Sequence, residues 1–163
     1  MTRAFALLLS CAALSGCGLQ PLYNGGSAGP VATTLQSVSV DPIEGKSGWL
    51  VRNALNDRLS ATGNTASRYR LVVKLDDQIE GFGVRADDTI TRERRSLKAR
   101  YQLIDNETNQ AVLDATAGSD AGIDVVSSEY ATIAGENTAL ENLSQKIAAQ
   151  IVTRLSLYAR QQK

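Results

Sequence analysis

The chain has 163 residues, and its 17 lysines and arginines balance 17 aspartates and glutamates, so the formal net charge is zero. This balance argues against a nucleic-acid-binding protein, which needs an excess of positive charge. The sequence holds no histidine, and its two cysteines, Cys11 and Cys17, lie at the N-terminus. The rest of the chain therefore has no disulfide and lacks the commonest general base and zinc ligand, which disfavours an enzyme.

The N-terminus is typical of a secretion signal that ends at an acylated cysteine. Arg3 precedes an apolar run that is too short to remain as a membrane-spanning helix. The Leu-Ser-Gly-Cys sequence that ends at Cys17 matches the lipobox of bacterial lipoproteins. We predict that residues 1–16 are removed and that Cys17 carries a diacylglycerol and an N-acyl chain, which together give a stable anchor. Gly18, rather than an acidic residue, favours the outer membrane. The alternative is an ordinary signal with an incidental cysteine.

The mature chain is predicted to contain a tether and one domain. Residues 17–34 include a glycine-rich polar stretch that is typical of a flexible tether, and residues 35–163 are expected to form a single domain. Valines alternate with serines in a first strand over Leu35–Val40, which ends at the Asp-Pro that follows. Ser47 is then expected to cap an amphipathic helix over residues 48–62.

Three strands are predicted next. Apolar and polar residues alternate over 69–80, which indicates a strand with one buried face. A turn that starts at Gly81 leads to a partner strand over about 91–104. After a polar turn, a third strand begins at Ala111 and is expected to bend at one of its glycines.

A long helix is predicted at the C-terminus, from Ser127 or Ser128 to about Arg160, because its apolar residues are spaced by three and four. The resulting order β-α-β-β-β-α is too irregular for alternating parallel units. It predicts an α+β fold of two layers, with a small, mostly antiparallel or mixed four-stranded sheet and two helices on one face. The opposite face of the sheet is left uncovered.

The predicted middle strand carries a cluster of cations, namely Arg92, Arg94, Arg95, Lys98 and Arg100. All but Arg95 share one strand face by alternation. The planar guanidinium group donates two hydrogen bonds at once to a phosphate or carboxylate, so this face is a candidate anion-binding site. The alternative is a solvated face whose cations pair with acids such as Asp76 and Glu80 on the neighbouring strand.

The segment from Cys17 to Tyr23 reads Cys-Gly-Leu-Gln-Pro-Leu-Tyr. It resembles the start of the lipopolysaccharide-assembly lipoprotein family LptE, which often opens Gly-Cys-Gly-Phe-Gln-Pro-Leu-Tyr; this chain departs from that pattern at Leu19. Residues 99–105 and the last helix are also similar to the alphaproteobacterial branch of this family, and the strand order agrees over nearly the whole mature chain.

The resemblance implies a protein that is not an enzyme and uses no cofactor. It implies a lipid-anchored outer-membrane subunit that plugs the barrel protein LptD from the periplasmic side, assists assembly of the barrel and contacts lipopolysaccharide in transit. On this interpretation the five cations are candidate lipopolysaccharide contacts, and the partners are LptD, lipopolysaccharide and the membrane.

Two other interpretations stay open. Another outer-membrane lipoprotein, acting as an auxiliary subunit of a lipid-transport or cell-wall machine, would share the anchor, the tether and the small mixed fold. A carboxylate enzyme or metal site would use Asp76, Asp77 and Glu80, although acids on a solvated strand need no catalytic role.

Overall fold

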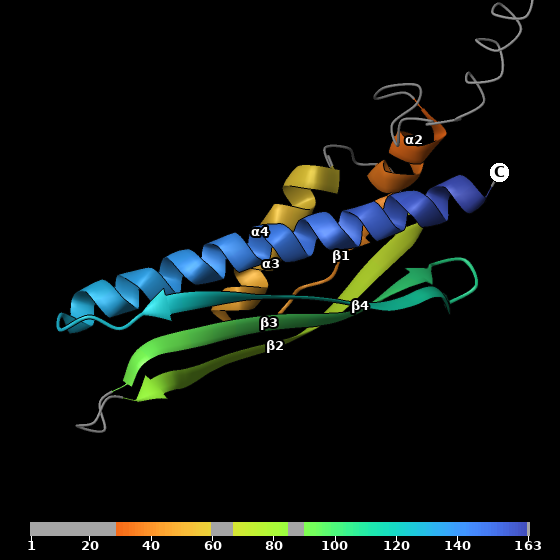
Figure 1. Cartoon of the computed structure of the whole chain (residues 1–163). Helices are drawn as coiled ribbons and strands as arrows, with labels where there is room; N and C mark the ends of the chain where they lie inside the picture. Colours follow the sequence, from red (N-terminus) through yellow and green to blue (C-terminus); the bar gives the residue numbers. More distant parts are fainter. Residues whose placement is uncertain (1–28, 60–66, 85–89, 163) are drawn as a thin grey trace, which may run out of the picture.

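The computed structural model describes residues 29–59, 67–84 and 90–162. Four strands form one open sheet in the order β1-β2-β3-β4, and helices α2, α3 and α4 lie on one side of it (Figure 1). The predicted α+β fold with a mixed four-stranded sheet is confirmed. One face of the sheet therefore packs against helices, and the other face is free of them among the described residues.

Helix α2 (Pro30–Gln36) precedes a short strand β1 (Val38–Val40). The predicted tether is therefore wrong at residues 30–34, and the predicted strand is wrong at residues 35–37. Residues 17–28 of the predicted tether lie outside the described residues. Val31 and Leu35 are four residues apart, so they share one helix face, and both are buried in the core. Proline at the first helical position favours this start. The glycine-rich sequence before α2 indicated a tether, and so this helix was not predicted.

Helix α3 (Gly45–Leu59) connects β1 to strand β2 (Tyr69–Val84), and the two strands pair in parallel. A parallel pair needs such a crossover, because the chain must return to the same end of the sheet. The helix starts before the predicted Ser47 cap, at Gly45, which has a positive φ of 78°. The predicted stop after residue 62 lies outside the described residues.

Strand β2 pairs with β3 (Ile90–Asp105) in a long antiparallel hairpin. Gly81 was expected to start the turn, but β2 continues to Val84 and that expectation is wrong. Gly83 has a positive φ of 79° and its carbonyl accepts a 2.7 Å hydrogen bond from the Thr91 hydroxyl. The strand thus accommodates the positive φ of Gly83 and continues past this residue.

Strand β4 (Gln110–Asp124) pairs antiparallel with β3 and forms one edge of the sheet. The pairing keeps its register through both Gly118 and Gly122, so neither glycine forms a β-bulge of the kind that would bend the strand. The irregularity lies at the other end of the strand, beside Leu103 and Ile104.

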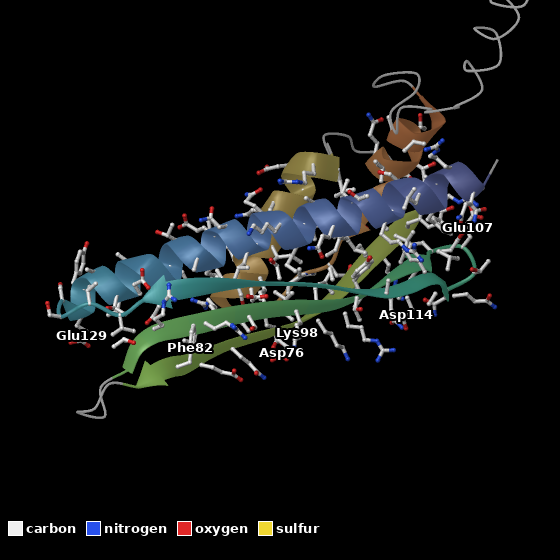
Figure 2. All side chains as sticks on the ribbon, viewed as in Figure 1. Asp76, Phe82, Lys98, Glu107, Asp114 and Glu129 are labelled. Atoms are coloured by element: carbon white, nitrogen blue, oxygen red, sulfur yellow. The ribbon has the colours of Figure 1, made fainter. Side chains whose placement is uncertain are left out.

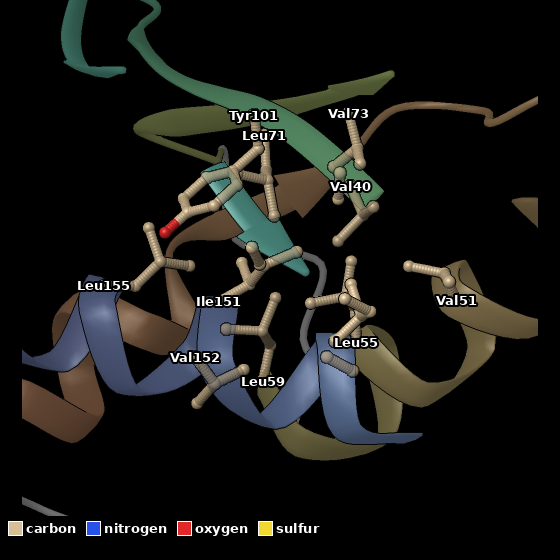
Figure 3. Packing of buried hydrophobic residues seen from close by; sticks show 14 of the residues in the cluster. Val40, Val51, Leu55, Leu59, Leu71, Val73, Tyr101, Ile151, Val152 and Leu155 are labelled. Carbon is tan, nitrogen blue, oxygen red and sulfur yellow. The ribbon is translucent and has the colours of Figure 1, made fainter. Parts of the chain in front are cut away.

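Helix α4 (Glu129–Gln161) confirms the long C-terminal helix and runs over β3 and β4 while contacting α2 and α3. Its 33 residues correspond to a length of about 50 Å. The side chain of Ser128 caps its first turn by accepting a hydrogen bond from the Ala131 N–H. Figure 3 shows α4 side chains packed against residues of α3 and of the sheet, among them Val40, Val51, Leu55, Leu71, Tyr101, Ile151 and Leu155.

Candidate functional site

The outer face is defined here as the side of β2, β3 and β4 that points away from the helices (Figure 2). On β3, residues of odd number from Leu97 to Tyr101 are buried beneath the helices. The structure places the alternate residues on the outer face, where four cations are exposed: Arg92, Arg94, Lys98 and Arg100.

Carboxylates on β4 approach three of these cations. The shortest distances are 3.0 Å for Arg92 and Asp124 and 3.0 Å for Arg100 and Asp114, and Arg94 lies 4.0 Å from the aspartate that is its diagonal neighbour, Asp120. The side chains of all three pairs are at least 40% exposed, so water and salt screen these interactions. Each pair is therefore weak and exchangeable.

The ion pair between Arg100 and Asp114 shifts the pKa values of both side chains. Hydrogen bonds from Arg100 and then from Gln102 hold the pKa of Asp114 below its ordinary value. The same hydrogen bond raises the pKa of the Arg100 guanidinium. Both groups are therefore charged at neutral pH, and the positive charge of Arg100 offsets the negative charge of Asp114.

Lys98 differs from its neighbours because it makes no ion pair within 4.0 Å among the described residues. Its cross-strand neighbours are Asp76 on β2 and Gly118 on β4, and a glycine offers no carboxylate. In the next row, Lys74 lies opposite Arg100. A hollow of about 590 Å³ on the sheet is lined in part by Lys74, Asp76, Lys98 and Arg100.

Arg95 is separated from the other four cations. It lies on the helix side of β3, where its guanidinium donates hydrogen bonds of 2.8 and 2.7 Å to the Asp77 carboxylate and one of 3.1 Å to the Glu136 carbonyl. The Arg95 and Asp77 side chains are only 12% and 19% exposed. The hydrogen bonds to Asp77 raise the pKa of Arg95. Arg95 thus joins the hairpin to α4 within the fold.

The three acids considered as a catalytic or metal site do not converge. Asp76 and Glu80 are exposed on the outer face, whereas Asp77 is half-buried on the helix side and binds Arg95. The described part of the chain holds no cluster of acids that is suited to a metal ion. Cys17, the predicted lipidation site, lies outside the described residues.

Sequence reasoning missed the acids that pair with the outer cations. It expected Asp76 and Glu80 on β2, whereas the partners in the structure are the aspartates of β4, at positions 114, 120 and 124. It also missed Phe82, whose ring centre lies 5.4 Å from the Arg94 guanidinium carbon. The alternation of residues along β4 could have placed these aspartates on the outer face. Their pairing with the arginines of β3 could not be predicted without the register between the two strands.

Among the described residues, no helix is both long enough and apolar enough to cross a membrane. The fold is a small α+β domain, and bacterial lipoproteins of known structure share this fold. A proposed lipoprotein from Caulobacter crescentus CB15 is 24% identical, with a TM-score of 0.70 over 83% of this chain and 98% of that chain. Rare lipoprotein B from Shewanella oneidensis is 9% identical, with a TM-score of 0.59 over 76% of this chain and 95% of that one.

A minor lipoprotein from Acinetobacter baumannii shares 14% identity, with a TM-score of 0.55 over 74% of this chain and 90% of the other. At these identities the likeness concerns the fold. The sequence model of the lipopolysaccharide-assembly family LptE matches residues 35–155, and the chain belongs to this family. Among curated proteins, no sequence matches this chain.

Proposed function

We propose that this protein is a lipid-anchored outer-membrane subunit of the lipopolysaccharide transport machinery. In this proposal, residues 1–16 are removed as a signal, and acyl chains on Cys17 hold the domain at the periplasmic side of the outer membrane. The domain plugs and helps to assemble the barrel protein LptD, and its outer face contacts lipopolysaccharide in transit. The match of residues 35–155 to the lipopolysaccharide-assembly family carries the proposal.

The outer face supports a ligand role because its ion pairs are exposed. Exposed pairs contribute about 0.2–1 kcal/mol each, so a phosphate can replace an aspartate beside an arginine at little cost. Phosphate also carries more charge and accepts both N–H groups of the guanidinium fork. The four cations of the outer face thus remain available to an anionic ligand, whereas Arg95 does not, because it is tied to Asp77 and Glu136.

Lys98 is the first residue that we expect a ligand to reach. It has no carboxylate within ion-pair distance among the described residues, and the absent side chain of Gly118 leaves the β4 side of it open. Lys74 and Arg100 border the same hollow. Phosphate groups of a glycolipid would meet several cations there.

Binding of purified lipopolysaccharide to the full chain tests this ligand role. The variant carrying Arg94→Glu and Lys98→Glu should bind lipopolysaccharide at least about tenfold more weakly, because two attractive charges become repulsive. Lys146→Glu, a single charge reversal at an exposed position on α4, is the control for added negative charge and should bind like the wild type. Equal binding by all three proteins, with unchanged circular dichroism, would remove the outer face from the proposal.

Partner and anchor need a separate experiment. Affinity purification of the acylated protein from detergent-solubilised outer membranes should recover the LptD barrel, and mass spectrometry should find the acyl chains on Cys17. The variant Cys17→Ser should remain unacylated and leave the membrane fraction. Recovery of cell-wall synthases without a barrel protein would favour the auxiliary-subunit interpretation instead.

A further inference from the structure

Strand β4 leaves one long edge of the sheet without a partner strand among the described residues. In an antiparallel ladder, backbone groups of alternate residues point to opposite sides of the strand. The Gly118 backbone points outward, away from β3, since a side chain of α4 binds it. The residues that share its direction, Thr116, Asp120 and Gly122, therefore also direct their N–H and C=O groups to the open edge.

The side chain of Gln150 occupies the place of one residue of a neighbouring strand. Its amide accepts a hydrogen bond from the Gly118 N–H and donates one to the Gly118 carbonyl, both at 3.2 Å. A residue of an added antiparallel strand would form the same two bonds. The Gly118 backbone thus already binds an amide group in the manner of a strand, and the Gln150 side chain satisfies the edge at this one residue.

Two hollows lie between β4 and α4, one on each side of this contact. The first, of about 690 Å³, is lined by residues that include Ala115, Thr116 and Leu157. The second, of about 720 Å³, is lined by residues that include Ala121 and Gly135. The linings also hold charged side chains, Arg154 in the first hollow and Lys146 in the second. An added strand directs every second side chain toward the helices, so side chains of moderate size can enter these hollows with their apolar part against Ala115 or Ala121 of β4.

The charges on the outer face indicate what such a strand carries on its other side. The outer row of β3 is positive and that of β4 is negative, with Asp114, Asp120 and Asp124 exposed next to the open edge. Opposite charges on neighbouring strands are favourable, and like charges are unfavourable. A second copy of this chain that paired through its own β4 would place aspartates beside aspartates, whereas lysines or arginines would continue the alternation.

We propose that the β4 edge binds an extended segment of a partner protein by strand addition. The segment carries lysine or arginine at every second position, toward the outer face, and apolar residues between them, toward the hollows. Backbone hydrogen bonds supply the affinity, and the alternating side chains supply the specificity. This edge adjoins the proposed lipopolysaccharide contacts, because Thr116, Gly118 and Gln150 also line the hollow beside Lys98. Peptide binding measured in the absence of lipopolysaccharide therefore tests the edge alone.

Amide hydrogen exchange on the full chain in detergent tests the proposal with defined peptides. The probe is a peptide that alternates lysine with valine and is as long as β4; the control alternates glutamate with valine. The lysine peptide should slow exchange at the Thr116, Asp120 and Gly122 amides, which face the open edge. The odd-numbered amides from Leu113 to Ile123 point toward β3 in this register and should change little. Absence of protection at the three outward amides would overturn the proposal, as would equal protection by the glutamate peptide.

Substitutions at two positions separate strand addition from unspecific attraction. Gln150→Ala frees the Gly118 backbone, so the lysine peptide should bind roughly fivefold more tightly, since two competing hydrogen bonds are gone. Asp120→Lys should weaken binding, and Asp120→Asn should lie between it and the wild type. Both positions are exposed, so the fold should tolerate these changes. Weaker binding by Gln150→Ala would place the peptide elsewhere and refute the edge.

Discussion

Two ion pairs of the same type, one largely buried and one exposed, allow the role of Arg95 to be measured. Arg95 and Asp77 are 12% and 19% exposed and share two hydrogen bonds, whereas Arg92 and Asp124 are 63% and 76% exposed. We propose parallel double-mutant cycles in which each partner, and then both, are replaced by leucine. Burial is then the main difference between the two cycles.

The expected magnitudes follow from the exposed fractions. Removal of one partner from a buried pair costs about 3–5 kcal/mol, and exposed pairs contribute about 0.2–1 kcal/mol. Because the Arg95 pair keeps some contact with water, we expect Asp77→Leu or Arg95→Leu alone to lower the free energy of unfolding by about 2–3 kcal/mol. The double variant should regain most of this loss, because no charge is left without a partner. The coupling energy between Arg92 and Asp124 should be below about 0.5 kcal/mol.

Urea unfolding followed by circular dichroism measures these free energies, and thermal unfolding should show the Arg95 single variants melting about 4–10 °C lower. Coupling energies of equal size in the two cycles would refute the reasoning that burial decides the strength of these pairs. Loss of lipopolysaccharide binding by a fully folded Arg95→Leu variant would return Arg95 to the ligand-binding set.

Two further predictions concern close packing and acid. Gly48→Ala should lower the free energy of unfolding by more than about 2 kcal/mol, because the added Cβ would lie 2.5 Å from the backbone oxygen of Ile43; Gly122→Ala, with open space around the new Cβ, is the matched control, and equal losses would contradict the packing argument. Asp114→Asn should be less stable than the wild type at neutral pH. Since the folded pKa of Asp114 is lowered by Arg100, this difference should fade as the pH falls below about 4, and a difference that grows in acid during urea unfolding would be contrary to expectation.

Periodicity predicted the elements whose residues meet water on one side and the core on the other. The hairpin strands and α4 have long, regular apolar patterns, so their existence and their buried faces followed from the sequence. Helix α2 did not, because only Val31 and Leu35 are buried among its described side chains, and they follow a glycine-rich stretch of sequence. A helix of this size depends on packing against the rest of the core, which the local sequence does not contain.

The candidate site was predictable in its residue types and not in its partners. Alternation assigned Arg92, Arg94, Lys98 and Arg100 to one strand face and Arg95 to the other. The position of the β4 aspartates opposite them depends on the register between two strands, including the irregularity beside Leu103. A shift of one residue would turn those aspartates to the helix side, and composition alone does not fix that register.

The alternating signs of neighbouring strands also determine how far the outer face acts. Strands are about 4.8 Å apart, so the cations of β3 and the aspartates of β4 are close enough to form ion pairs. Their electric fields therefore cancel at distances beyond about 10 Å. Such a surface does not draw an anion from bulk water, as a uniformly basic groove would. Recognition then starts only once a ligand has already been delivered to the sheet, and the encounter rate should depend little on ionic strength.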